Sequence, residues 1–167
     1  MKDKFRAAAE ADRALRAVQD RNPYAALGRI STYLMSKPSF ANLKFGGWMR
    51  TMIGQINRGH YFLVIEGEKT VGFAGWALAD EVKAKAWASG GCDLDSNECR
   101  RGDCMVINAW AADNDAVNMF IRRELRRRGL GLKAAYAKRF YEDGRVRPLR
   151  LGTTGAMASH VDKSKQA

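Results

Sequence analysis

The sequence lacks the features that would carry the chain into a membrane or a secretory route. Nothing in its 167 residues approaches the run of about eighteen apolar residues that a membrane-spanning helix needs. The N-terminal stretch MKDKFRAAAEADRALRAVQD is charged throughout and has no apolar core of the kind found in secretory signals. We therefore expect a cytoplasmic protein with no membrane span.

Cysteine is scarce too, with only Cys92, Cys99 and Cys104. An odd number in a chain that is not secreted predicts free thiols rather than a disulfide framework. The spacings, six and four intervening residues, match no common zinc-ligand pattern, and no histidine lies nearby. We expect a polar loop with incidental thiols and no metal site.

What the sequence does have is positive charge, +11 from 29 Lys and Arg against 18 Asp and Glu. A field of this size attracts polyanionic partners and speeds their association. Nucleic acid, an anionic membrane surface and an acidic carrier protein all fit the charge. The length and the hydrophobic fraction of 46% are those of one folded domain.

Hydrophobic periodicity predicts helices followed by a sheet. The expected helices cover residues 3–20, 24–35, 42–57, part of 79–89, and 113–129; the expected strands lie in 60–78, 103–112 and a final hairpin that turns at Asp143-Gly144, with a helix over 132–142 as the alternative. Pro148 belongs on an edge strand, because proline cannot donate to a sheet ladder. The pattern predicts an α/β (α+β) fold, with an N-terminal helical extension over 1–21, one domain over 22–152 and a disordered tail over 153–167.

Residues Arg126 to Gly131 fit the pattern R-x-x-G-x-G, with which acyl-CoA N-acetyltransferases bind a pyrophosphate. That motif should follow a strand and open a helix, so that backbone N–H groups and the helix dipole meet the phosphates. Here it closes a predicted helix, which favours an ordinary helix-terminating glycine at Gly129.

The arginines that precede this glycine admit several interpretations. An arginine-rich helix can neutralise phosphates, but no aromatic residues are interleaved for base stacking, which disfavours nucleic acid. A solvated helix end with favourable charges is the plainest interpretation. A dock for an acidic carrier protein uses the same face and also accounts for the net charge, and its expected residues are Arg122, Arg123, Arg126, Arg127 and Arg128.

Three segments carry a family likeness. NPYAALGRISTYLMSKP resembles the opening of the RTX-toxin-activating lysine acyltransferases, HYFLVIEGEKTVGFAGWALADE is similar to their central hairpin, and MVINAWAADNDA is similar to their next strand. The likeness covers about residues 22 to 151. It implies an acetyltransferase-like (GNAT) fold, with a mixed, mainly antiparallel sheet flanked by helices.

The resemblance also implies an activity, the transfer of a fatty acyl group from acyl carrier protein to a protoxin lysine. On this basis we expect no bound cofactor, acyl carrier protein as the donor in preference to acyl-CoA, and a peptide or protein as the acceptor. The acceptor amine could be lysine or ornithine. A homodimer is left open.

Two positions depart from the family pattern. Phe40 stands where the family has a catalytic histidine, and Asn108 stands where it has a catalytic aspartate. A lysine acceptor must lose an ammonium proton, with a pKa near 10.4, and phenylalanine cannot take it. The candidate substitutes are His60, Asn108 as an orienting amide, and Asp113, although helix capping accounts for at least one of Asp113 and Asp115.

Aromatic residues could hold the acyl chain. We expect Ser39, Trp76 and Trp110 to line the substrate, with the two tryptophans on adjacent strands. The same residues fit an ordinary core equally well. The sequence thus predicts an acyl-carrier-protein-dependent N-acyltransferase, and the alternative is a non-catalytic module that binds an acidic protein, fatty acid or nucleic acid.

Overall fold

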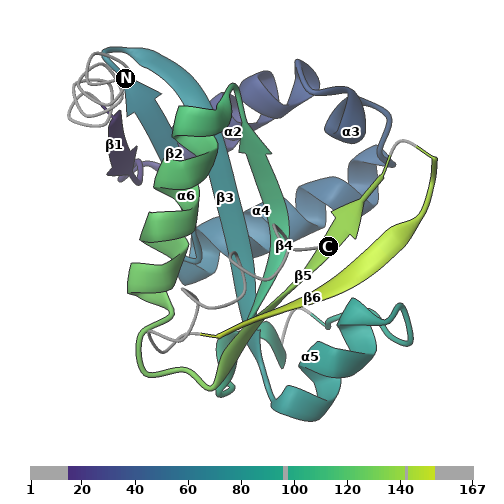
Figure 1. The fold of residues 1–167 in the computed structure, drawn as a ribbon. Coiled ribbons are helices and arrows are strands. Elements are labelled where there is room, and N and C mark those ends of the chain that lie inside the picture. The colour runs from purple at the N-terminus through teal and green to yellow at the C-terminus, as the bar shows by residue number, and fades with distance from the viewer. Residues whose placement is uncertain (1–14, 96–97, 142, 153–167) are drawn as a thin grey trace, which may run out of the picture. The chain divides into compact units, whose positions relative to one another are not determined.

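The computed structural model describes residues 15–95, 98–141 and 143–152, and Figure 1 shows its ribbon. The described strands are β1 (Leu15–Val18), β2 (Tyr61–Glu66), β3 (Lys69–Ala79), β4 (Cys104–Ala112), β5 (Ala134–Phe140) and β6 (Val146–Gly152). The helices are α2 (Pro23–Met35), α3 (Pro38–Ala41), α4 (Phe45–Arg58), α5 (Glu81–Ala88) and α6 (Asp115–Arg128), with a 3₁₀ turn at Glu98–Arg100.

The strands form one sheet in the order β1-β2-β3-β4-β5-β6. The pairs β1/β2, β2/β3 and β5/β6 are antiparallel, whereas β4/β5 is parallel. This mixed, mainly antiparallel sheet with helices confirms the predicted α/β fold class. Contacts divide the chain into two compact units, Met1–Trp76 with Ala109–Leu125, and Ala77–Asn108 with Arg126–Ala167. The single domain expected over 22–152 stays a prediction.

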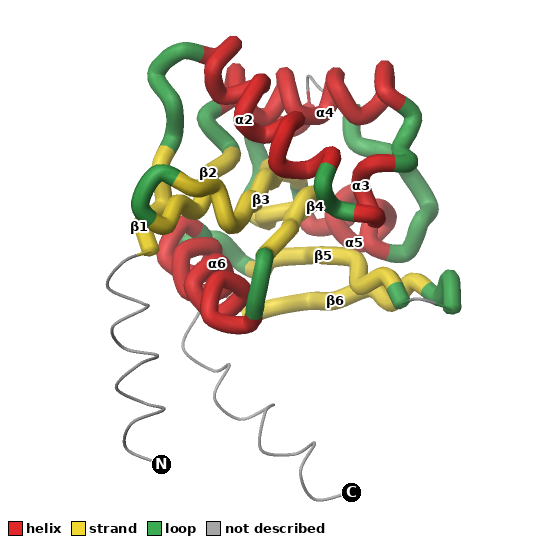
Figure 2. The backbone as a smooth tube through the Cα atoms, turned by 90° about the horizontal axis from the view of Figure 1, so that it is seen from above, coloured by secondary structure: helices red, strands yellow, loops and turns green. Residues whose placement is uncertain are grey.

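In the first unit, α2 and α4 cover one face of the strands, and Figure 2 shows them on the side away from α6. Asn22 caps α2 by accepting hydrogen bonds from the N–H groups of Tyr24 and Ala25, and Gly59 ends α4 with a φ of 68°. The core between the helices and the sheet is made of Ala26, Ile30, Tyr33, Leu34, Met52, Tyr61, Leu63, Phe73, Ala109 and Ala111.

The first part of α6 packs on the opposite face of the first unit. A side-chain carbon on Gly72 of β3 would lie 2.7 Å from Val117 and 3.1 Å from Ile121, so the glycine allows the helix to approach the strand. This close packing on β3 holds the first turns of α6 against the sheet.

The helix predicted over residues 3–20 is wrong where the structure describes it. Leu15–Val18 form β1, in which Arg16 pairs with Ile65 and Val18 with Leu63. Leu15 is buried, with 6% of its surface exposed. Pairing with β2 overrides the helical propensity of this alanine-rich stretch, because tertiary contacts outweigh such weak preferences. Residues 3–14 and the tail over 153–167 lie outside the described residues.

The second unit contains α5, the first part of β4, and the hairpin of β5 and β6. The alternative helix over 132–142 is wrong, since Ala134–Phe140 form β5 and pair with β6. Pro148 lies on β6 at the edge of the sheet, as predicted. Small residues dominate one core cluster of this unit, which consists of Ala77, Ala79, Ala84, Ala88, Cys99, Cys104, Val106, Ala134 and Tyr136. Met105 and Ile107 of the same unit are also buried.

The remaining predicted elements are confirmed with small shifts, and the break after α2 contains the four-residue helix α3. Cys92 is half-buried, Cys99 and Cys104 are buried, and all three are free thiols. The described ranges hold no group of three or more His, Cys, Asp or Glu side chains that could bind a metal ion. No helix within those ranges has the length and apolarity needed to span a bilayer.

Candidate functional site

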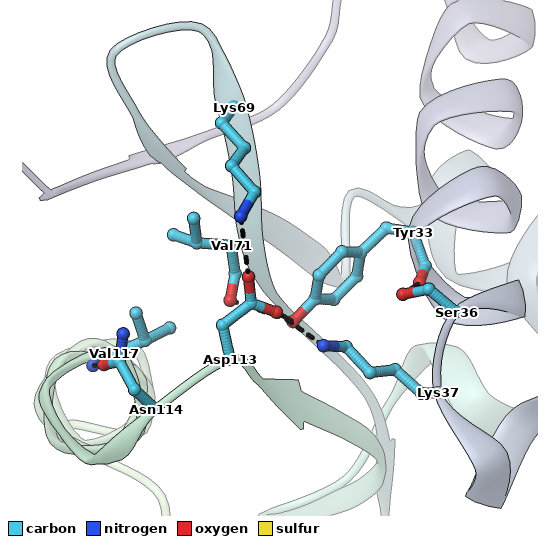
Figure 3. A network of polar contacts seen from close by, with 8 residues as sticks. All are labelled: Tyr33, Ser36, Lys37, Lys69, Val71, Asp113, Asn114 and Val117. Atoms are coloured by element: carbon cyan, nitrogen blue, oxygen red, sulfur yellow. Dashed lines mark hydrogen bonds and ion pairs between the residues drawn. The ribbon is translucent and has the colours of Figure 1, made fainter.

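Asp113, the first of the two residues between β4 and α6, gathers three side chains that come from distant parts of the first unit (Figure 3). Its Oδ1 accepts hydrogen bonds from the Tyr33 hydroxyl at 3.0 Å and from Lys37 Nζ at 2.5 Å. Its Oδ2 lies 3.5 Å from Lys69 Nζ. The Tyr33 hydroxyl is also 2.8 Å from the Val71 carbonyl oxygen, so two acceptors share its proton. One carboxylate thus connects α2, β3 and the residue that precedes α3.

The environment keeps Asp113 ionised and Tyr33 protonated. Burial alone would raise the pKa of Asp113, but the hydrogen bonds from Lys37 and Tyr33 and the charges of both lysines lower it overall. Burial raises the pKa of Tyr33, and the bond to Asp113 raises it further. A carboxylate held by two ammonium groups is a weak proton acceptor, so this arrangement suits the positioning of Lys37 better than catalysis by a base.

Lys37 is also the N-cap residue of α3, the short helix that carries Ser39 and Phe40. Ser39 is exposed, whereas Phe40 is half-buried. The Phe40 ring packs on Trp48 of α4, with 5.1 Å between centroids and a tilt of 45°. The position at which the resemblance expects a catalytic histidine is therefore filled by an aromatic packing contact.

His60 stands between the end of α4 and the start of β2. Its backbone N–H donates to the Gln55 carbonyl at 2.9 Å, and its carbonyl accepts from the Trp76 N–H at 3.0 Å. The half-buried imidazole stacks on the Trp76 indole, with 5.8 Å between the ring centroids and an angle of 14° between the rings. The Phe62 ring lies tilted beside the same indole, with 6.1 Å between the ring centroids. The imidazole is thus fixed against an aromatic surface on the strands.

Trp76 and Trp110 stand on the neighbouring strands β3 and β4, as predicted. A side chain on Gly75 would overlap Gln55 of α4, so Trp76, the next residue, points to the opposite face. Ala109 and Ala111 pack in the core beneath α2 and α4, so Trp110 also points away from that core. The two indoles therefore share one face of the sheet with the ring of His60.

Asn108 belongs to the second unit, as the last of its residues in β4. It is half-buried in a strand whose flanking residues Ile107 and Ala109 are buried. A half-buried amide can donate or accept a hydrogen bond but cannot act as a base at neutral pH.

The two ends of α6 differ in charge. At the N-terminus, Asn114 Oδ1 accepts the N–H of Val117 at 3.0 Å, and Asp113 and Asp115 flank this cap. A diphosphate at this helix end would compete with the protein's own cap and meet two carboxylates. The N-terminus of α6 is therefore a poor diphosphate site.

At the other end, the Gly-Leu-Gly stretch closes α6, as predicted. The Gly129 N–H donates to the Arg126 carbonyl at 3.2 Å, and the Leu132 N–H donates to the Gly129 carbonyl at 3.1 Å. Gly131 has a φ of 86°, which favours glycine. The stretch is a helix-terminating turn and does not open a helix as a phosphate-binding loop does.

The arginines expected to dock a carrier protein lie along the last turns of α6. Arg122, Arg123, Arg126 and Arg127 are exposed, and Arg128 is half-buried. The Arg123 guanidinium lies 5.2 Å from the centre of the Phe120 ring. Arg126, Arg127 and Arg128 also interact favourably with the negative end of the helix dipole.

Sequence reasoning missed Tyr33, Lys37 and Lys69 as partners of Asp113. Tyr33 occupies a core position of α2, and its sequence signal is that of any amphipathic helix. Its hydroxyl meets a carboxylate 80 residues further along the chain. No local pattern could have linked the two.

The fold resembles that of a known structure. The loading GNATL domain of CurA from Lyngbya majuscula is similar to this chain, with a TM-score of 0.51 and 11% identity over 77% of this chain. This chain spans 65% of the length of that domain. At this identity the likeness concerns the fold alone, and it confirms a GNAT-like fold.

The family follows from the sequence. The model of the HlyC family, described as the RTX toxin acyltransferase family, matches residues 19–146. Because that span covers more than half of the 167 residues, the chain belongs to the RTX toxin acyltransferase family. The predicted resemblance is confirmed, and acyl transfer is the activity of this class. None of the curated proteins matches the chain.

Proposed function

We propose that the protein transfers a fatty acyl group from acyl carrier protein to a side-chain amine, of lysine or ornithine, in a peptide or protein. The observation that carries this proposal is the family match over residues 19–146, which spans all the proposed site residues. The donor, the acceptor and the site residues are our inference.

The charges of α6 support a carrier protein as the donor. The capped N-terminus, with Asp113 and Asp115, disfavours the diphosphate of coenzyme A. The exposed arginines at the other end match an acidic protein surface, and such complementarity speeds association. The donor would then present its acyl group as a phosphopantetheine thioester, and the protein itself would need no bound cofactor.

The reaction joins an amine to a thioester carbon. The acceptor ammonium loses a proton, its nitrogen forms a bond to the carbonyl carbon, and the carbon–sulfur bond breaks to release a thiol that takes up a proton. We assign the base to His60, because a neutral imidazole can accept this proton and its ring is held on the indole of Trp76. Asn108 would hold the acyl carbonyl or the amine through its amide.

Two further roles complete the proposed mechanism. Trp76 and Trp110 would line the acyl chain, which is supported by their position on the same face of adjacent strands. Asp113 would act as a positioning residue that holds Lys37 and, through it, the α3 helix with Ser39. In this assignment Asp113 takes no proton from the substrate.

The test is intact-mass spectrometry of an amine-bearing peptide incubated with the protein and long-chain acyl carrier protein, with acyl-CoA in a parallel reaction. We expect one added acyl mass from the carrier protein and far less from acyl-CoA. His60→Ala should abolish transfer, and added imidazole should restore part of it. Asn57→Ala, at an exposed residue of α4, is the matched control and should leave the rate unchanged. Full activity of His60→Ala would remove this residue from the mechanism.

The docking surface has its own test. Replacing the exposed Arg122, Arg126 and Arg127 by serine should raise the KM for the acyl carrier protein by about tenfold and leave kcat nearly unchanged. The matched control also replaces three arginines, Arg139, Arg145 and Arg147, which are exposed on β5 and on and beside β6. Equal losses in both variants would mean that net charge, not the α6 surface, attracts the donor.

A second candidate function is a non-catalytic module that binds an acidic protein, fatty acid or nucleic acid. It is favoured by the packing of Phe40 on Trp48 where the family pattern has a histidine, and by the amide of Asn108. The double variant Phe40→His with Asn108→Asp separates the two functions. Transfer that appears only in this variant would identify a binding protein built on a transferase fold, and steep salt dependence of DNA binding would identify a nucleic-acid partner.

A further inference from the structure

The segment from Arg21 to Ile65 contains no aspartate or glutamate. It contains six basic side chains, Arg21, Arg29, Lys37, Lys44, Arg50 and Arg58. This segment forms α2, α3, α4 and almost all of β2. Two of these cations pair with carboxylates outside the segment, Arg29 with Asp20 and Lys37 with Asp113. The segment itself still contributes only positive charge, in addition to the arginines of α6.

Large apolar side chains are exposed on this same layer. We call four of them the apolar platform: Met35 is 71% exposed, Leu43 47%, Phe45 76% and Ile53 42%. Leu43 lies in the connection between α3 and α4, and Phe45 is the first residue of α4, with Lys44 between them. Ile53 lies about two turns further along α4. None of the four α3 residues is buried. Leu43 and Phe45 are thus exposed at the α3–α4 connection, and Met35 and Ile53 are exposed on α2 and α4.

The same two helices, α3 and α4, also carry side chains that contact the core. Phe40 packs on Trp48, and both side chains contact the core of the first unit together with Met49. The Arg50 guanidinium folds back over the first turn of α4, where it lies 3.5 Å from the place that a side-chain carbon on Gly46 would take. Exposed cations, Lys44 and Arg50, therefore border the exposed Phe45.

We propose that the apolar platform docks the protein reversibly on an anionic phospholipid bilayer. Projecting aromatic and aliphatic side chains bordered by Lys and Arg are suited to the interface between lipid headgroups and acyl chains. Each basic residue near an anionic leaflet adds about 1 kcal/mol of attraction, and no carboxylate of the segment opposes it. Long basic side chains can extend their charges to the headgroups while their stems lie along apolar surface.

A bilayer fits this surface better than a protein partner. A protein partner would have to offer pockets that match these particular side chains in shape. A cavity of about 370 Å³ in the first unit is lined by other residues, namely Gly28, Arg29, Thr32, Tyr33 and Thr70. Lipid accepts projecting side chains without a preformed shape. The inference does not depend on acyl transfer.

The experiment is flotation of the full chain with vesicles of phosphatidylglycerol and phosphatidylcholine, compared with pure phosphatidylcholine. We expect binding to the anionic vesicles at low ionic strength and loss of binding at high salt. Leu43→Ser with Phe45→Ser should weaken the partition by about tenfold or more, because two apolar side chains leave the interface. Lys44→Glu with Arg50→Glu should weaken it selectively for anionic vesicles.

Matched controls lie elsewhere on the surface. Val82 is 78% exposed and Met119 is 60% exposed, and replacing both by serine should leave vesicle binding unchanged. Lipids brominated on their acyl chains should quench the fluorescence of Trp48, and Trp48→Phe should remove most of that quenching.

The proposal is overturned if the wild-type chain fails to float with anionic vesicles at low ionic strength. It is also overturned if the Val82 and Met119 control loses as much binding as the Phe45 variant. If the Phe45 variant binds vesicles normally but loses affinity for acyl carrier protein, the platform is a protein dock and the lipid assignment is wrong.

Discussion

The two compact units have cores of different kinds. The first unit buries large side chains, such as Ile30, Leu34, Met52, Leu63 and Phe73. A core cluster of the second unit consists of five alanines and two cysteines with Val106 and Tyr136, and the unit also buries Met105 and Ile107 outside this cluster. A core of large side chains is sensitive to truncation, which leaves a cavity, whereas a core of small residues allows close approach and is sensitive to enlargement.

The largest expected effect tests the truncation side of this comparison. Phe73→Ala should lower the free energy of unfolding by about 3–5 kcal/mol, because Phe73 is fully buried in the first unit. Val106→Ala in the second unit removes a smaller volume and should cost about 2 kcal/mol. Urea unfolding followed by circular dichroism measures both. Equal losses of unfolding free energy in the two variants would contradict the difference between the two cores.

Enlargement should affect the second unit. Gly102 has a φ of 152°, and a side-chain carbon there would overlap the backbone of Ala79. Gly102→Ala should therefore cost about 1–3 kcal/mol beyond backbone strain, because backbone atoms cannot move aside easily. Gly90→Ala is the control: its φ is 82° and nothing lies within 4 Å, so it isolates the strain. Equal destabilisation of the two variants would show that the overlap is relieved by local movement.

The polar contacts of the two units differ as well. The Tyr33 hydroxyl contacts Val71 and Asp113 at 2.8 and 3.0 Å, whereas the Tyr136 hydroxyl lies 3.3 Å from Glu81 and 3.2 Å from Arg150. Tyr33→Phe should cost about 1–2 kcal/mol, and Tyr136→Phe about 0.5–1 kcal/mol, since its partners are nearer to solvent. Thermal unfolding should rank the two in this order, and the reverse order would contradict our account of the Asp113 network.

The smallest expected effect is on the pH dependence of the free energy of unfolding, which Asp113 lowers at acid pH and Tyr33 lowers at alkaline pH. The pKa of Asp113 is lowered on folding, so its contribution is complete above the ordinary value of about 3.9 and is lost as the pH falls below it. The pKa of Tyr33 is raised, so its contribution is complete below about pH 10 and is lost as the pH rises further. Urea unfolding across pH should show the acid loss reduced in Asp113→Asn and the alkaline loss reduced in Tyr33→Phe. Profiles parallel to the wild type in both variants would exclude this network as the cause.

Much of the fold could be predicted because its signals are local. Asn22 and Pro23 mark the start of α2, Gly59 ends α4 with a positive φ, and the change of hydrophobic period marks the hairpin of β2 and β3. The prediction failed at Leu15–Val18, where alanine-rich residues with helical spacing pair with β2. A short edge strand depends on its partner strand, which no local window contains.

The family, the GNAT-like fold class, the net charge and the helix end at Gly129 could all be predicted from the amino-acid sequence. These follow from motif order, composition and the residues on either side of a helix end. Three features became visible only in the folded chain: the contacts of Asp113 with Tyr33, Lys37 and Lys69, the packing of Phe40 on Trp48, and the exposure of Phe45. The physical reason is distance along the chain: hydrogen bonds, burial and pKa shifts depend on partners that only the folded chain brings together.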